Sequence, residues 1–366
     1  MHKLMATSTI LEHELSELRL LVERQTGIVL ECPSSALAAH VADYVEEQGL
    51  GTSGVLLERL RSADADPVNL ASLLDGLLNN NTGFFRHPGA LNALTRQVVP
   101  QLCARKSADG PSPLRIWSAG CSSGEETYSI AMAVCDAVSQ MAASCNNGNG
   151  NTNGNGKTSR GGIVDSEKIT PSPVNPAALA IHIVGSDLLP QNIEAADRGV
   201  YRQSAVDGLP PATIRNYFSK INSPAVPRAV EEDAEEDRIE SRSSGSRSGL
   251  ARNGLSSNLQ SSANAAHLMV KPRLRSMVTF NCMNLARPGY IGRFDCIFCM
   301  DVLPHFSRAQ RIALIERLHL YLEPGGYLFL SQTEKLIPSN LNFRSETFDG
   351  YTFHRKPLAA SAAYGR

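Results

Sequence analysis

The chain has 366 residues, 42% of them hydrophobic, which is enough for one large domain and a smaller one. Its formal net charge of −1 predicts no global attraction to nucleic acid or to an anionic membrane. The N-terminus lacks the apolar stretch of a signal peptide, and no later run of about 18 apolar residues predicts a membrane span. We therefore expect a cytoplasmic protein without direct membrane insertion, in which the eight cysteines are reduced thiols.

Residues 1–80 are predicted to form a small helical domain. Thr9 and Glu12 fit a capping box, apolar residues then recur at helical spacing, and Gly27 is a stop signal for this first helix. Three more amphipathic segments follow, at residues 34–48, 54–61 and 69–78. Residues 81–113 are predicted to be an interdomain linker with a helix.

From Leu114 onward, short apolar strands alternate with helices. Strands are predicted at residues 114–120, 178–187, 276–284, 294–302 and 327–331. One helix is predicted at 125–139, and another between a capping box of Ser307 with Gln310 and a stop at residues 324–326. This alternation predicts a mostly parallel sheet covered on both faces, in a domain spanning residues 114–366.

Two stretches interrupt that domain. Residues 140–176 are rich in Asn, Gly and Ser, and residues 221–267 hold an acidic block followed by a Ser/Gly/Arg-rich tract. Both have too little apolar content to offset the entropy of ordering, so we expect disordered insertions. Solvated surface insertions are the simpler interpretation. A regulatory or binding role for the acidic block is the alternative.

A glycine turn directly after the first strand is the first candidate site. Gly120 allows a tight turn and a close approach of the backbone to a ligand, and Glu125 and Glu126 follow at the start of a helix. The motif is not GxGxxG and no basic residue follows, which disfavours a phosphate-binding loop. Two carboxylates suit a ligand with a cationic or hydroxyl-bearing portion, although a purely structural turn is also compatible with the pattern.

Asp187, at the end of the second strand, is the second candidate. In nucleotide-binding sheets an acid at this position accepts hydrogen bonds from ribose hydroxyls. It usually follows the glycine turn by about 20 residues. The spacing is longer here, and the Asn/Gly-rich insertion accounts for most of the excess. Together, the turn and the acid predict a nucleoside site in the first half of the sheet.

The third candidate is the segment NNNTGFFR, at residues 79–86. Its two aromatic residues and its arginine are compatible with interdomain packing. Arg86 is equally compatible with a bidentate grip on a carboxylate of a cofactor or a substrate.

Several motifs together resemble the chemotaxis-receptor glutamate methyltransferases, the CheR family. NNNTGFFR is similar to the family's N-x-T-x-F-F-R signature, and RIWSAGCSSGEETYSIAM to its first sheet motif. GSDLLPQNIEAADRGVY, FNCMNL, FDCIFCMDV and LEPGGYLFLSQTEKL resemble later motifs in the correct order. The resemblance covers nearly the whole chain except the two insertions.

The resemblance implies a Rossmann-like methyltransferase sheet with a small all-helical N-terminal domain, using S-adenosylmethionine and releasing S-adenosylhomocysteine. Asn80, Thr82 and Arg86 would contact the cofactor or line the methyl-transfer site. Gly120, Glu125 and Glu126 would bind its amino-acid portion, and Asp187 its ribose. The adenine would lie between Asn284 and Leu285, with further cofactor contacts at Met300 and Asp301. Arg86 and His305 would be the catalytic residues, and the partner a chemoreceptor or related signalling protein methylated by a monomer.

The implied chemistry is methyl transfer to a glutamate carboxylate. That nucleophile is already ionised at neutral pH, since its reference pKa is about 4.3, so no strong base is required. Alignment and desolvation can supply roughly 7–11 kcal/mol. No metal is implied either, because Cys296 and Cys299, the lone CxxC pair, lie in an apolar strand where burial explains them better than metal or redox chemistry.

The chain departs from the family near the expected site. Met300 and Asp301 stand where the family usually has Arg-Asn, and His305 where it has tyrosine. These changes leave two alternatives open: a catalytically degenerate homologue that binds the cofactor and regulates, and a methyltransferase of the same fold acting on a small molecule. His305 is also compatible with a loop residue that has no role.

The N-terminal domain departs as well. Residues 1–78 hold five Lys/Arg and twelve Asp/Glu, a net charge of −7, and the helix at residues 34–48 carries His40 but no Lys or Arg. A negatively charged face would repel an acidic methylation helix, which predicts a partner unlike a typical chemoreceptor methylation region. The family's small β-subdomain is expected between residues 217 and 277, where the second insertion interrupts it.

Overall fold

The computed structural model describes most of the chain in two compact units, residues 1–199 with 272–366, and residues 200–271. The described residues are 10–62, 67–78, 82–108, 112–147, 179–221, 266–289, 292–336 and 341–358. No helix among them is long and apolar enough to cross a membrane. Asn80 and Thr9 lie outside the described residues.

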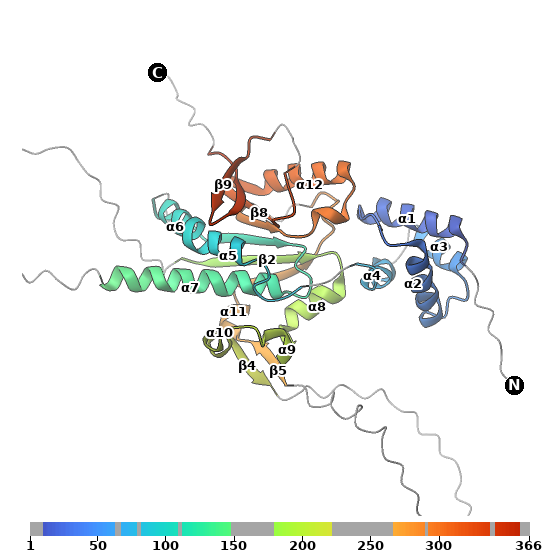
Figure 1. Cartoon of the computed structure of the whole chain (residues 1–366), viewed down its shortest axis with the longest axis horizontal. Helices are drawn as coiled ribbons and strands as arrows, with labels where there is room; N and C mark the ends of the chain where they lie inside the picture. The colour runs from blue at the N-terminus through green and yellow to red at the C-terminus, as the bar shows by residue number, and fades with distance from the viewer. Residues whose placement is uncertain are drawn as a thin grey trace, which may run out of the picture. The chain divides into compact units, whose positions relative to one another are not determined.

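The first unit begins with the predicted helical domain (Figure 1). Its helices are α1 (Glu12–Thr26), α2 (Ser34–Glu47), α3 (Ser53–Arg61) and α4 (Pro67–Asp75). Leucines and valines at helical spacing, such as Leu15, Leu18 and Val22 of α1, are buried at its centre. Gly27 ends α1 with φ 78°, as predicted. The start of α1 was placed too early, because the N-cap is Leu11, whose N–H donates to the Glu14 carboxylate at 2.9 Å.

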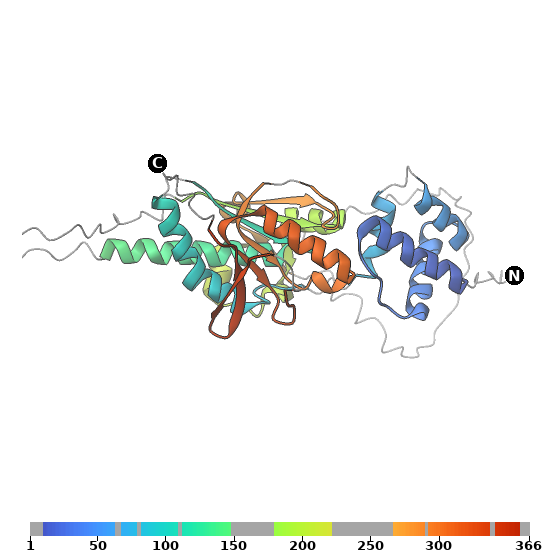
Figure 2. The same cartoon turned by 90° about the horizontal axis from the view of Figure 1, so that it is seen from above.

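A seven-stranded sheet forms the rest of this unit, in the order β6-β2-β1-β7-β8-β10-β9 (Figures 1 and 2). The parallel strands are β1 (Leu114–Ala119), β2 (Ile181–Asp187), β6 (Val278–Cys282), β7 (Phe294–Cys299) and β8 (Leu322–Leu330). These strands confirm the α/β prediction. The antiparallel hairpin of β9 (Arg344–Phe348) and β10 (Tyr351–Arg355) was not predicted, because β9 is largely exposed and neither strand carries a continuous apolar run.

Helices cover both faces of the sheet, as expected. Successive residues of a strand point to opposite faces. Trp117 of β1 packs edge-on against Tyr321 of α12 (Arg308–Tyr321), whereas the next residue, Ser118, reaches Glu126 of α7 (Glu125–Asn147). The CxxC cysteines, Cys296 and Cys299, are fully buried in β7, as predicted.

Several predicted boundaries are wrong. Helix α7 continues through Asn147, so the first insertion does not begin at residue 140. Its Ala-rich turns remain helical past the expected end. Helix α12 ends at Tyr321, and Pro324-Gly325-Gly326 lies within β8, next to an irregularity in its pairing with β7. Ser307 is the N-cap of α12, but its side chain makes no capping hydrogen bond.

The second unit, residues 200–271, contains a three-stranded antiparallel sheet in the order β3-β5-β4. Its elements are β3 (Val200–Arg202), α9 (Gln203–Val206), α10 (Pro211–Tyr217), β4 (Phe218–Ile221) and β5 (His267–Val270). The expected β-subdomain therefore exists. The predicted insertion limits are each too wide by one residue, since residues 221 and 267 pair in the sheet, and residues 222–265 lie outside the described part.

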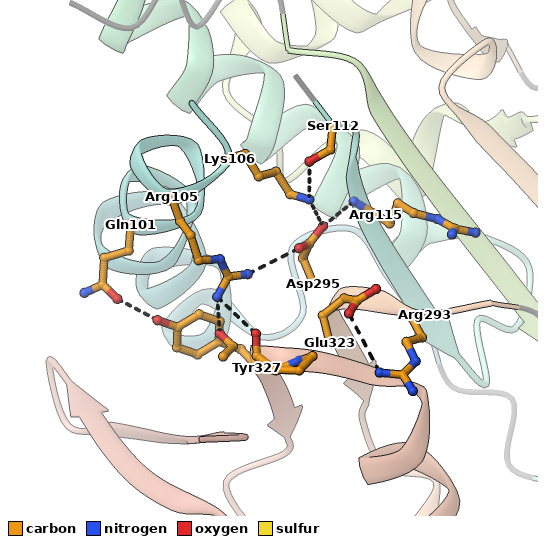
Figure 3. Close-up of polar contacts among 11 residues, drawn as sticks. Gln101, Arg105, Lys106, Ser112, Arg115, Arg293, Asp295, Glu323 and Tyr327 are labelled. Carbon is orange, nitrogen blue, oxygen red and sulfur yellow. Dashed lines mark hydrogen bonds and ion pairs between the residues drawn. The ribbon is translucent and has the colours of Figure 1, made fainter. Parts of the chain in front are cut away.

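Between the helical domain and the sheet, residues 82–108 hold a continuous helical stretch, as the linker prediction allowed. It consists of α5 (Pro88–Ala93), a π-helical turn (Leu94–Val98) and α6 (Val99–Ala108). A buried carboxylate fixes α6 to the sheet (Figure 3). Asp295 is 2% exposed and lies 2.9 Å from Lys106 Nζ and 3.4 Å from Arg105 Nη2, and it accepts the Arg115 N–H at 2.9 Å.

Candidate active site

One cavity, open to solvent, lies at the carboxyl ends of the central strands. The chain order reverses there, since β2 and β6 extend the sheet on one side of β1, and β7 and β8 on the other. Open α/β sheets bind ligands at this kind of switch point. The cavity is lined by most of the residues predicted for the site, namely Thr82, Arg86, Gly120, Glu126, Asp187, Asn284, Leu285, Met300, Asp301 and His305.

The glycine turn after β1 forms part of the cavity wall. Gly120 has φ 85°, and a Cβ added there would lie 2.4 Å from Val302 Cγ2, so a side chain at this position would be both strained and obstructed. The Ser186 carbonyl accepts hydrogen bonds from the N–H groups of Gly120 and Cys121 at 2.8 and 2.9 Å. The turn is thereby held against the end of β2.

Asp187 lies at the cavity edge, held by three donors. Its Oδ1 accepts from Leu189 N and Asn192 Nδ2, both at 3.0 Å, and its Oδ2 accepts from Ser122 N at 2.9 Å. A carboxylate oxygen has two lone-pair positions, so within the described part of the chain Oδ2 retains acceptor capacity toward a hydroxyl ligand.

Glu126 is the most perturbed acid of the cavity. Burial raises its pKa to about 7, although Ser118 Oγ donates a hydrogen bond to Oε1 at 2.7 Å. The negative charges of Asp301 and Glu334 raise the pKa of Glu126 further, and Arg86 lowers it. Burial penalises the ionised form of Glu126, and a cation bound in the cavity would offset that penalty by its charge.

Glu125 differs from its neighbour in position and in hydrogen bonding. It is 8% exposed and is not among the residues that line the cavity. Ser123 Oγ donates to its Oε2 at 2.7 Å. Burial raises the pKa of Glu125, and hydrogen bonds from Ser123 and Thr82 oppose that shift. Its position favours holding the glycine turn over direct contact with a ligand.

The loop after β7 is organised around one carboxylate. Glu334 Oε2 accepts from Asp301 N at 3.2 Å and from Ser331 N at 2.9 Å, and Oε1 accepts from Leu303 N at 2.9 Å. Burial raises the pKa of Glu334, and these backbone hydrogen bonds lower it. The loop therefore takes its shape from contacts between Glu334 and the backbone.

Asp301 brings Arg86 and His87 together. Its Oδ2 lies 3.1 Å from Arg86 Nη2 and 3.2 Å from His87 Nε2. Burial lowers the pKa of His87, against the opposing effect of Asp301, so at pH 7 the imidazole is mostly neutral. Arg86 and Asp301 then carry the charges of this cluster, and they largely cancel.

His305 lies where the helical domain contacts the sheet domain. It ends a short 3-10 helix, η3 (Leu303–His305), and its carbonyl accepts the Val29 N–H at 2.8 Å. Burial lowers the pKa of His305, although Asp301, Glu31 and Asp187 act in the opposite direction. A second contact joins the domains, because Asn284 Nδ2 donates to the Gln25 carbonyl at 3.0 Å.

Backbone strain is concentrated at this cavity. Three of its non-glycine lining residues have positive φ: Phe85 at 53°, Ser122 at 48° and Asp301 at 57°. Such conformations are costly for residues with a Cβ and cluster at sites where function requires them. The strained backbone therefore lies at the same cavity as the predicted site residues.

Sequence reasoning missed some residues of the cavity. His87 adjoins the predicted Arg86, but a single histidine gave no signal of its own. Thr26, Ile28 and Phe306 also line the cavity. Their apolar or short side chains look like ordinary core residues, and only the packing of the helical domain on the sheet domain brings them here.

Comparison with known proteins identifies the family. The SAM-binding domain of CheR methyltransferases matches residues 80–146 and 246–351. Chemotaxis protein methyltransferase 1 of Pseudomonas aeruginosa is 27% identical over 321 residues, which are 87% of this chain and 88% of that protein. The chain is similar to the CheR methyltransferases along most of its length. It is an S-adenosylmethionine-dependent methyltransferase by family, with S-adenosylmethionine as its cofactor.

Two further matches extend the comparison. Chemotaxis protein methyltransferase Cher2 of Pseudomonas putida is 24% identical over 326 residues, covering 88% of this chain and 90% of that protein. The solved magnesium protoporphyrin IX methyltransferase of Synechocystis with bound SAM is 14% identical and covers 80% of this chain and 97% of that chain. Its TM-score of 0.27 is too low to support an argument.

The chemistry of the cavity fits this cofactor. S-Adenosylmethionine carries hydroxyls on a ribose, a cationic sulfonium, and an ammonium beside a carboxylate. The cavity offers Asp187 Oδ2 as an acceptor, half-buried Glu126 as a potential anion, and Arg86 as a cation. Gly120, whose backbone lines the cavity, brings the turn close to a bound ligand. The donor set is therefore suited to the cofactor.

Proposed function

We propose that this CheR-type methyltransferase is a protein-glutamate O-methyltransferase of chemotaxis-like signalling, which methylates a glutamate carboxylate of a chemoreceptor or related signalling protein. The observation that carries the proposal is the single cavity that joins Asp187, Glu126 and Arg86 at the switch point of the sheet. The chemotaxis methyltransferases to which the chain is similar support the same proposal.

In this proposal the cofactor is held at three places. Asp187 Oδ2 accepts from the ribose, the Asn284–Leu285 backbone and side chains flank the adenine, and Arg86 holds the methionyl carboxylate. Glu126 ionises against the positive charge of the amino-acid end. Thr82, Gly120 and Met300 line the same cavity, and Glu125 supports the glycine turn. Asn80 lies just before Thr82 in the chain. When bound, the cofactor supplies an electrophilic methyl group on a sulfonium.

The protein's own contribution to the reaction is positioning and removal of water. An acceptor glutamate is ionised at neutral pH and needs no base. Phe85, Phe298 and Phe306 line the cavity and limit the access of water. His305, whose pKa is lowered by burial, is neutral at pH 7 and serves as a hydrogen-bond donor that orients the acceptor carboxylate. The Asp301 carboxylate, in contrast, opposes an incoming anion.

The charge of the helical domain constrains the partner. Asp43, Glu46 and Glu47 of α2 are exposed, and no Lys or Arg accompanies them on that helix. A partner with a basic or neutral surface beside its acceptor glutamate fits this face better than a strongly acidic helix. We propose that the enzyme works as a cytoplasmic monomer on such a signalling protein.

The test is transfer of labelled methyl groups. Purified enzyme and S-adenosylmethionine labelled in the methyl group are incubated with receptor-containing membranes, and protein-bound label is treated with alkali. A glutamate methyl ester releases volatile methanol, whereas methyl groups on nitrogen stay bound. We expect alkali-labile label that Asp187→Ala abolishes and the remote Glu323→Gln preserves. Alkali-stable label, or label only in small molecules, would contradict the proposal.

A second candidate function follows from one observation, the pairing of Asp301 with Arg86. If that pair prevents turnover, the chain is a regulatory homologue that binds the cofactor without transferring its methyl group. Cofactor binding by calorimetry with no transfer to any membrane or lysate protein is the result that favours it.

A further inference from the structure

The Arg86–Asp301 contact has a consequence for recognition of the cofactor. Arg86 Nη2 lies 3.1 Å from Asp301 Oδ2, inside the cavity that both residues line. The contact is an ion pair, and a second carboxylate that binds Arg86 must share its positive charge with Asp301. Any ligand carboxylate that approaches Arg86 also meets the negative charge of Asp301.

We propose that Asp301 competes with the methionyl carboxylate of the cofactor for Arg86, and so weakens and tunes the affinity of this chain for S-adenosylmethionine. The inference rests on the proposed role of Arg86 in cofactor binding. It makes Asp301 a specificity-determining residue, because the penalty applies only to ligands that carry a carboxylate at that end.

The position of Asp301 is fixed independently of its carboxylate. Its N–H donates to Glu334 Oε2 at 3.2 Å, and Glu334 also holds Leu303 N at 2.9 Å. The backbone of Asp301 has φ 57°, in the left-handed region that asparagine tolerates as well as aspartate does. Asp301→Asn therefore removes the charge while it preserves the shape of the loop.

The surroundings of the pair set the size of the effect. The side chains of Arg86 and Asp301 are 43% and 33% exposed, so solvent screens part of their interaction. His87, at 3.2 Å from the same oxygen, adds little attraction at pH 7, where it is mostly neutral. We expect Asp301→Asn to tighten binding of S-adenosylmethionine about threefold to tenfold, in line with a partly exposed pair.

The experiment compares two ligands by calorimetric titration, without an acceptor protein. The first is S-adenosylmethionine, and the second is decarboxylated S-adenosylmethionine, which keeps the sulfonium and the amine but lacks the carboxylate. Each is titrated into the wild type, Asp301→Asn, Arg86→Met and the double variant. Glu323→Gln is the matched control, because it removes one carboxylate from a half-exposed arginine pair outside the cavity.

The proposal predicts tighter S-adenosylmethionine binding in Asp301→Asn, no tightening for the decarboxylated ligand, and no effect of Asp301→Asn in the Arg86→Met background. Weaker binding of S-adenosylmethionine in Asp301→Asn would overturn it and assign Asp301 to the ammonium group. Equal tightening of both ligands, or a change within twofold, would overturn it too, as would no binding by any variant. Because no acceptor is present, failure to methylate a receptor leaves the outcome unaffected.

Discussion

Glu126 makes the stability of the cofactor-free protein depend on pH in a predictable direction. Its pKa is about 7 in the folded protein, raised by burial from an ordinary value of 4.5. Between these two values the folded state holds a proton that the unfolded state has lost. Stability is therefore highest below pH 4.5 as far as Glu126 is concerned, and it falls as the pH rises through 7.

The magnitude follows from the size of the shift. One pKa unit corresponds to about 1.4 kcal/mol, so the shift from 4.5 to about 7 costs at most about 3.5 kcal/mol above pH 7. Glu126→Gln keeps an oxygen that can accept from Ser118 Oγ, a bond of 2.7 Å in the wild type, and it removes the ionisation. The variant should be more stable than the wild type at pH 8 and nearly equal to it at pH 5.

The assay is urea denaturation at several pH values from 5 to 8, followed by circular dichroism. The informative quantity is the difference in unfolding free energy between Glu126→Gln and the wild type, because other titrating groups contribute equally to both. Glu323→Gln, at a half-exposed carboxylate, is the control and should show no such trend. A difference that stays constant across this pH range would refute the reasoning.

Three other predictions concern packing, the turn and the partner. Asp295→Asn should lower the unfolding free energy by about 3 kcal/mol, because it leaves the cations around a buried carboxylate uncompensated (Figure 3), as urea denaturation against Glu323→Gln would measure. Gly120→Ala should weaken S-adenosylmethionine binding at least about tenfold in calorimetry, because φ 85° and a 2.4 Å contact with Val302 force the turn to move; unchanged affinity would contradict this. Neutralising the exposed acids of α2 should lower KM for an acidic receptor segment at low salt and have no effect at high salt, where screening removes the repulsion; these acids are Asp43, Glu46 and Glu47.

Much of the fold could be predicted because its central strands are buried on both faces. The continuous apolar runs around Trp117 and Ile297 are typical of strands in a parallel sheet, and the apolar residues of the helical domain recur at helical spacing. The hairpin of β9 and β10 could not be predicted in the same way. β9 is largely exposed, and the pairing of β10 depends on β8, which offers Leu328 and Tyr327 as partners.

The candidate site was predictable where a residue type has one usual function at the end of a strand. Asp187 at the end of β2 and Gly120 after β1 are of this kind. The pairing of Arg86 with Asp301 was not predictable, since more than 200 residues of chain separate them and no local pattern links them. The roles assigned to individual residues remain predictions, for which the variants above are the tests.

The contacts of the loop after β7 explain how this site can differ in charge from the family pattern without a change in the fold. Glu334 binds the backbone N–H groups of Asp301 and Leu303, and these contacts do not involve the side chains at 300, 301 or 305. The shape of the loop is therefore independent of the residues that set its charge. A substitution of Asp301 can therefore change the electrostatics of ligand recognition at little cost in stability. This separation is why the charge at Asp301 reports on ligand choice, and why its effect should appear in binding constants before it appears in unfolding.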